Sequence, residues 1–170
     1  MNPFSEDNLV EQTAIKLIKE IWADSACHIN AYSDEEDAKL GRAHRGEVVL
    51  TKYLLPALKK INPELPDEAL EQAVEQLSRN RSQMSLVNAN KEIYQILRDG
   101  ASVQVMNRDG EYETETAKFF DFANPSNNSF LCVSQLWVVG EMHTRRPDVL
   151  LFVNGIPLLL IKEFLICSRS

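Results

Sequence analysis

Acidic and basic side chains near the C-terminal end of the sequence could together hold a divalent cation. Asp148 precedes an apolar run, 149–153, and a second apolar run, 156–161, leads to the adjacent Lys162 and Glu163. Carboxylate oxygens are the ligands that Mg²⁺ prefers, and a bound cation can activate water for hydrolysis. Two acids and a lysine therefore indicate a candidate metal-dependent hydrolytic site, provided that the chain folds back to bring them together.

The two apolar runs predict a β-hairpin that brings them together. Asn154 and Gly155 stand between the runs, and Asn-Gly flanked by apolar residues is a strong hairpin signal. A two-residue turn would pair Asp148 with Ile161. Because side chains alternate between the two faces of a strand, this register places Glu163 on the face of Asp148. A site with two carboxylates would then survive.

A three-residue loop with a bulge would give the opposite result. Such a loop carries glycine in the left-handed conformation and would pair Asp148 with Leu160. Lys162 and Phe164 would then share the face of Asp148, and the second carboxylate would be missing. The residues of the hairpin alone leave both registers open.

Helical periodicity dominates the first hundred residues and strand periodicity the remainder, which predicts an α/β (α+β) fold with a central mixed β-sheet flanked by helices. Four helices are expected, namely one from Ser5 with an apolar stripe (Val10, Ala14, Leu17, Ile18, Ile21), then Val48–Ile61, Pro66–Leu77 and Asn88–Arg98. Strands are expected over 101–106, 111–122 and 129–139, before the hairpin. The polar segment 24–46 reads as a surface excursion. Residues 1–170 are expected to form a single domain.

Composition sets wider limits on the function. With 170 residues, of which 44% are hydrophobic and 25% charged, the chain is typical of a globular domain. The net charge of -7 argues mildly against nucleic-acid binding, which usually shows as an excess of Lys and Arg, although a cleft for Mg²⁺ must itself be acidic. The sequence contains no GxxxxGK[ST] loop for ATP. The histidines His28, His44 and His143 lack metal-ligand spacing.

Several features predict a cytoplasmic protein without membrane association. The first residues are acidic and polar, unlike a signal peptide, and the longest apolar runs are too short to span a bilayer. The cysteines, Cys27, Cys132 and Cys167, have no paired spacing, which favours buried, reduced thiols.

The chain resembles the N-terminal nuclease domain of the restriction (R) subunit of type I restriction-modification enzymes, a PD-(D/E)xK type of endonuclease. The resemblance extends over nearly the whole chain and is carried by the order and spacing of four segments, 57–66, 90–100, 121–148 and the hairpin 146–164. It implies a restriction-endonuclease-like fold and Mg²⁺-dependent cleavage of double-stranded DNA. The implied partners are the modification and specificity subunits, and ATP would act only in a motor domain that this chain lacks.

The resemblance also assigns residues, and the chain departs from the family at two of them. Asp148 corresponds to the metal ligand. Fourteen residues later the family has the glutamate of a Glu-x-Lys motif, where this chain has Lys162, and Phe164 stands in place of the lysine. Because the family spacing needs both acids on one face, it favours the three-residue loop and predicts a broken site. The tail from residue 164 to 170 is atypical of the family.

Other candidate residues have two interpretations each. Glu11 matches a glutamate of the family's first helix that helps at the metal, but alone it would be a solvent-facing charge. Arg145 and Arg146 could contact DNA phosphates beside Asp148, or could be solvated. The main hypothesis is an endonuclease domain with doubtful activity; the alternative is a non-catalytic module that docks to the modification subunits or to DNA.

Overall fold

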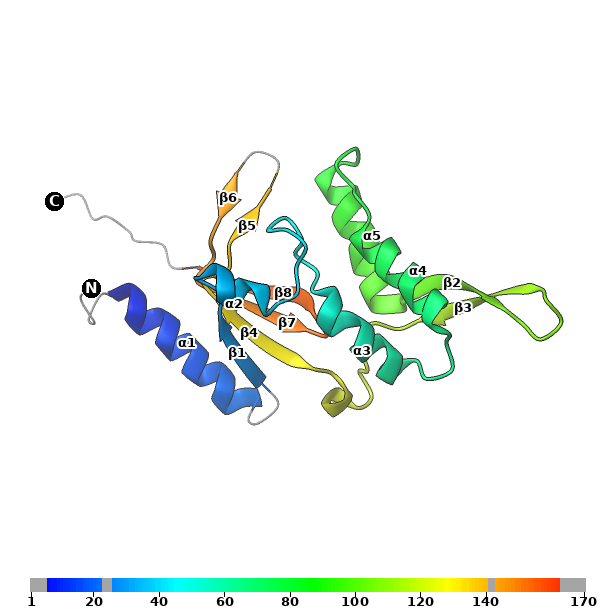
Figure 1. Cartoon of the computed structure of the whole chain (residues 1–170), viewed down its shortest axis with the longest axis horizontal. Helices are drawn as coiled ribbons and strands as arrows, with labels where there is room; N and C mark the ends of the chain where they lie inside the picture. The colour runs from blue at the N-terminus through cyan, green and yellow to red at the C-terminus, as the bar shows by residue number, and fades with distance from the viewer. Residues whose placement is uncertain (1–5, 23–25, 141–142, 163–170) are drawn as a thin grey trace. The chain divides into compact units, whose positions relative to one another are not determined.

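The computed structural model describes residues 6–22, 26–140 and 143–162 (Figure 1). Helices occupy most of the first half of the chain and strands most of the second half, and one of the sheets is mixed, which confirms the predicted α+β class. The chain divides into two compact units. Unit 1 comprises residues 1–50 and 130–170, and unit 2 comprises residues 51–129. The expectation that residues 1–170 form one domain stays a prediction.

Unit 1 is built on a four-stranded sheet that includes the predicted hairpin. Its strands, in spatial order, are β1 (Ala26–Asn30), β4 (Phe130–Ser134), β7 (Val149–Val153) and β8 (Ile156–Ile161). Strand β1 runs parallel to β4, whereas the β4–β7 and β7–β8 pairs are antiparallel. The sheet is therefore mixed, and β8 forms one of its edges.

The prediction that segment 24–46 is a surface excursion is wrong. This segment contains the edge strand β1 and the short helix α2 (Asp34–Ala38), which is capped by the Ser33 side chain. Strand β1 pairs with β4, more than 95 residues away in the sequence. Its five residues show no alternation of polar and apolar side chains. The strand is stabilised by pairing with that distant partner rather than by local propensity.

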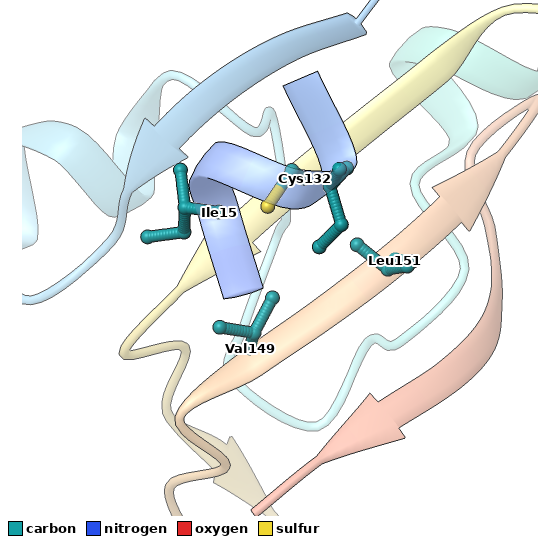
Figure 2. Packing of buried hydrophobic residues seen from close by; sticks show 5 residues of the cluster. Ile15, Cys132, Val149 and Leu151 are labelled. Carbon is teal, nitrogen blue, oxygen red and sulfur yellow. The ribbon is translucent and has the colours of Figure 1, made fainter. Parts of the chain in front are cut away.

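Helix α1 (Glu6–Trp22) covers one face of this sheet. Ile15 and Ile18 pack against Cys132, Val149 and Leu151 from the two central strands (Figure 2). The predicted apolar stripe is partly wrong, since Leu17 and Ile21 are exposed. Burial of Cys132 was expected, but Cys27 is exposed.

Unit 2 contains three helices and a β-hairpin. The helices are α3 (Thr51–Ile61), α4 (Asp67–Ser78) and α5 (Leu86–Asp99), and the hairpin strands are β2 (Ala101–Met106) and β3 (Tyr112–Ala117), followed by a 3₁₀ turn, η2 (Pro125–Asn127). Gln72 and Gln76 of α4 hydrogen-bond the backbone of β2. Helix α5 ends at Gly100, whose φ of 96° only glycine adopts without strain.

The strand predicted over 129–139 is interrupted. Gln135, at φ 58°, ends β4, and the chain continues into the short strand β5 (Val138–Val139), which pairs with β6 (Thr144–Arg145). A left-handed residue other than glycine is uncommon, so no sequence pattern marks this break. Within the described residues, no helix is both long and apolar enough to cross a membrane.

Candidate functional site

The β7–β8 hairpin turns through two residues, the first of the two registers that the hairpin sequence leaves open. Val153 pairs with Ile156, and Asn154 and Gly155 have φ values of 53° and 78°. Positive φ at both positions is the type I′ geometry whose twist matches that of the flanking strands. The Leu50 backbone N–H donates to the Gly155 carbonyl oxygen at 2.8 Å, which anchors the turn. The expected three-residue loop is therefore wrong.

A bulge further along the hairpin nevertheless changes the register by one residue. Phe152 pairs with Pro157, but Leu151 pairs with Leu159, which leaves Leu158 as the extra residue. Val149 then lies opposite Ile161, so the next residue pair outward is Asp148 and Lys162. The lysine is thus on the face of Asp148, the outcome expected from a three-residue loop, although the bulge lies in β8 rather than at the turn.

The side chains of Asp148 and Lys162 meet at the mouth of the hairpin. Lys162 Nζ lies 3.9 Å from Asp148 Oδ1 and donates to the Arg146 carbonyl oxygen at 3.3 Å. The Asp148 side chain is 26% exposed and the Lys162 side chain 45% exposed. This is therefore a partly solvated ion pair of modest strength. Its chemical effect is local, because the ammonium group of Lys162 occupies the space beside the Asp148 carboxylate. Glu163 and Phe164 lie outside the described residues.

Helix α1 contributes a second acid to this end of the sheet. Glu11 is only 8% exposed, so the interpretation as a solvent-facing charge is wrong. The Gln135 side-chain amide donates to Glu11 Oε2, and the Gln135 backbone N–H donates to the Asp148 carbonyl oxygen at 3.0 Å. Gln135 thus links α1 to the start of β7. No pattern in the sequence indicates this role, because it depends on the left-handed conformation of Gln135.

His28, which has no metal-ligand spacing in the sequence, belongs to the same neighbourhood. Its Nε2 lies 3.1 Å from the hydroxyl oxygen of Ser134, which is fully buried. Burial lowers the pKa of His28, and the nearby positive charge of Lys19 lowers it further, while Glu11 opposes both. A neutral imidazole is therefore favoured there at neutral pH.

The described residues do not fit a resident Mg²⁺. Mg²⁺ needs near-octahedral oxygen coordination, usually with one or two carboxylates, whereas Asp148 faces the ammonium group of Lys162. Glu11 is engaged by Gln135. In the ranges that the structure describes, no group of three or more His, Cys, Asp or Glu side chains gathers to hold a metal ion.

The two arginines predicted to contact DNA differ in their surroundings. Arg145 ends β6 and is exposed. Arg146 lies over two rings, with its guanidinium carbon 5.3 Å from the ring centre of Tyr32 and 5.0 Å from that of Trp137. Both distances are within the range of cation–π attraction. The aromatic partners were missed in the sequence, since Tyr32 and Trp137 are brought to Arg146 only by the fold.

A mixed α+β fold whose hairpin presents an aspartate at its mouth agrees with the class of nuclease domain that the sequence suggested. The family model of the type I restriction enzyme R protein N terminus matches residues 3–161. The chain therefore belongs to this family.

Two curated relatives agree with this assignment. The chain is 34% identical over 128 residues to the type I restriction enzyme HindI endonuclease subunit of Haemophilus influenzae, a match that covers 74% of the chain and 12% of the relative. It is 29% identical over 161 residues to the endonuclease subunit assigned to type I restriction enzyme MjaIXP of Methanocaldococcus jannaschii. This match covers 93% of the chain and 15% of the relative. The chain thus spans less than a sixth of the length of these relatives.

Proposed function

We propose that this chain is a nuclease-type module of a type I restriction enzyme that acts on double-stranded DNA together with modification and specificity subunits, and that its own Mg²⁺ site is impaired. Family membership supports the DNA substrate and the subunit partners. In the proposed reaction a divalent cation would activate water for phosphodiester hydrolysis. Asp148 would be the ligand for the metal.

One observation carries the proposal of impairment. Lys162 lies opposite Asp148 and its ammonium group is 3.9 Å from the carboxylate. A second carboxylate at this position would add to the negative charge that attracts the metal, whereas a lysine repels the metal and competes for Asp148. The isolated chain is therefore expected to bind Mg²⁺ weakly and to cleave DNA weakly or not at all.

The proposal is tested by restoring the acid. Calorimetric Mg²⁺ titration should detect no millimolar site in the unmodified chain but should detect one in Lys162→Glu, and the site should persist when Phe164→Lys is added to follow the family order. Adding Asp148→Ala should abolish binding, because one remaining carboxylate cannot hold a strongly hydrated cation. Nicking of supercoiled plasmid is the second readout.

A charge-matched control is Lys91→Glu on α5, where the side chain is exposed; it should bind no Mg²⁺. Binding of Mg²⁺ by the unmodified chain through Asp148 and Glu163, detected as loss of binding in Asp148→Ala and in Glu163→Gln, would show that the site is intact and the proposal wrong.

The Asp148–Lys162 ion pair also supports a second candidate function, a non-catalytic module that keeps the fold in order to dock to modification subunits or DNA. The two proposals differ in the Lys162→Glu variant. Recovery of Mg²⁺-dependent nicking would favour a damaged nuclease. Recovery of neither metal binding nor nicking, in a variant that melts like the unmodified chain, would favour docking.

A further inference from the structure

Two arginines and two aromatic rings form a cluster beside the candidate site in unit 1. Arg146 lies over both Tyr32 and Trp137, and the guanidinium carbon of Arg45 is 5.9 Å from the Trp137 ring centre. We call these four residues the arginine–aromatic cluster. Tyr32 is 58% exposed and the Arg45 side chain 40% exposed, so both are accessible to a ligand.

A buried arginine, Arg42, hydrogen-bonds the backbone of two residues of the cluster. The Arg42 side chain is 2% exposed and pairs with Asp37. Its guanidinium donates to the carbonyl oxygen of Trp137 at 3.0 and 3.1 Å and to that of Arg45 at 3.4 Å. These bonds fix the backbone of Trp137 and Arg45, from which the ring and the guanidinium project.

The cluster is continuous with the mouth of the hairpin. Arg146 precedes Asp148 by two residues, and its carbonyl oxygen accepts from Lys162. Positive charge therefore concentrates here, in a chain whose net charge is -7. Asp34, which pairs with Arg45, is 89% exposed, so this ion pair is readily exchanged for a phosphate.

We propose that the arginine–aromatic cluster binds a single-stranded or locally unpaired segment of DNA, with phosphates on Arg45 and Arg146 and a base stacked on the ring of Tyr32. This inference rests on the proposed DNA substrate. An exposed ring beside arginines is the combination with which proteins hold single strands. In an intact duplex both faces of each base are covered by neighbouring bases, so Tyr32 could not stack.

The experiment uses Trp137 as its own reporter. The chain has two tryptophans, and Trp22 packs against Phe130 in unit 1 with ring centres 4.9 Å apart, so Trp22→Phe leaves Trp137 as the single fluorophore. This variant is titrated with a twelve-nucleotide thymidine oligomer and with a twelve-base-pair duplex, in EDTA. The single strand should quench the fluorescence and bind about tenfold more tightly than the duplex.

Substitutions in the same background then locate the contact. Tyr32→Ala should weaken single-strand binding about tenfold, Tyr32→Phe should retain it because the ring remains, and Arg146→Gln should weaken it and reduce its salt dependence. The matched control is Tyr112→Ala, which removes an exposed tyrosine of unit 2 (67% exposed) and should leave binding unchanged. Melting curves show that each variant is folded.

The outcomes separate this inference from the proposed function. Duplex bound as tightly as single strand, or equal affinity of Tyr32→Ala and the parent, would overturn the inference while leaving DNA as the substrate. Binding of neither DNA form by the isolated chain would also overturn the inference, whereas the proposed function is tested separately by metal binding and nicking in Lys162→Glu. Because no metal is present, a failure of Lys162→Glu to bind Mg²⁺ has no bearing on this result.

Discussion

At the scale of single residues, the ionic partner of Asp148 determines what this carboxylate can bind. Lys162 places an ammonium group 3.9 Å away, whereas Gln135 fixes the backbone of Asp148 and holds Glu11 in the interior. The acid of α1 and the acid that precedes β7 are thus both positioned by one glutamine. Arg146 is positioned in turn by contacts with two rings.

Thiol chemistry provides a residue-scale prediction about the packing of α1. Burial raises the pKa of Cys132 to about 11, so that at pH 8.5 less than about 1% of it would be thiolate. In a Cys167→Ser background, iodoacetamide should modify the exposed Cys27 quickly and Cys132 only after urea is added. Mass spectrometry of the two peptides checks this. Equal labelling rates in the native protein would place Cys132 outside the core.

At the scale of elements, the bulge in β8 determines which side chain faces Asp148. If β8 had no bulge, Leu158 would pair with Leu151, and the two-residue turn would place Ile161 opposite Asp148 and turn Lys162 to the other face. The bulge depends on a hairpin held firmly in the sheet. Phe152 of β7 is fully buried.

Phe152→Ala should therefore destabilise the protein by about 3–5 kcal/mol, through lost burial and the cavity left behind. Leu159→Ala is the matched control on the neighbouring strand. Leu159 is 53% exposed, so its truncation should change the free energy of unfolding by no more than about 0.5 kcal/mol. Urea denaturation followed by circular dichroism measures both. Equal midpoints for the two variants would mean that the hairpin is not part of the core.

The segment around α2 depends on a buried ion pair. Arg42→Ala removes the ionic partner of Asp37 and one donor from each of three carbonyl oxygens, including that of Trp137. It should cost about 3–5 kcal/mol. Lys59→Ala, which removes a surface pair with Asp67 that is 66% exposed on the lysine side, should cost less than about 1 kcal/mol. If Arg42→Ala changed the free energy of unfolding as little as Lys59→Ala, the arginine–aromatic cluster would not depend on the hydrogen bonds of Arg42.

At the scale of the whole molecule, the net charge of -7 limits electrostatic attraction to DNA. The positive charge near Asp148 is local. A protein of this kind can hold DNA through a few phosphate contacts but gains little long-range steering, so the partners proposed above would supply most of the affinity in an assembled enzyme.

For the chain alone, the dissociation constant for short duplex DNA at physiological salt should lie in the non-specific range of about 10⁻⁴ to 10⁻⁶ M. Affinity should fall as salt rises, because binding releases counterions from the phosphates. Fluorescence anisotropy with a labelled duplex of random sequence measures both. A sequence-selective nanomolar complex formed by this chain alone would contradict the prediction.

The sequence by itself determined the α+β class, the hairpin with its turn at Asn154 and Gly155 but not the length of that turn, and the replacement of the expected acid by Lys162. These features follow from local periodicity, local turn chemistry and residue identity. The resemblance to type I restriction subunits also came from residues in order along the chain.

Only the tertiary structure decided the features that depend on residues distant in sequence. Strand β1 forms by pairing with β4, the bulge at Leu158 arises where β8 meets β7, and Tyr32 reaches Arg146 across more than a hundred residues. The physical reason is the same in each case. Backbone register and ring contacts are set by the partner strand or side chain, and a local pattern contains no information about a partner that is elsewhere in the chain.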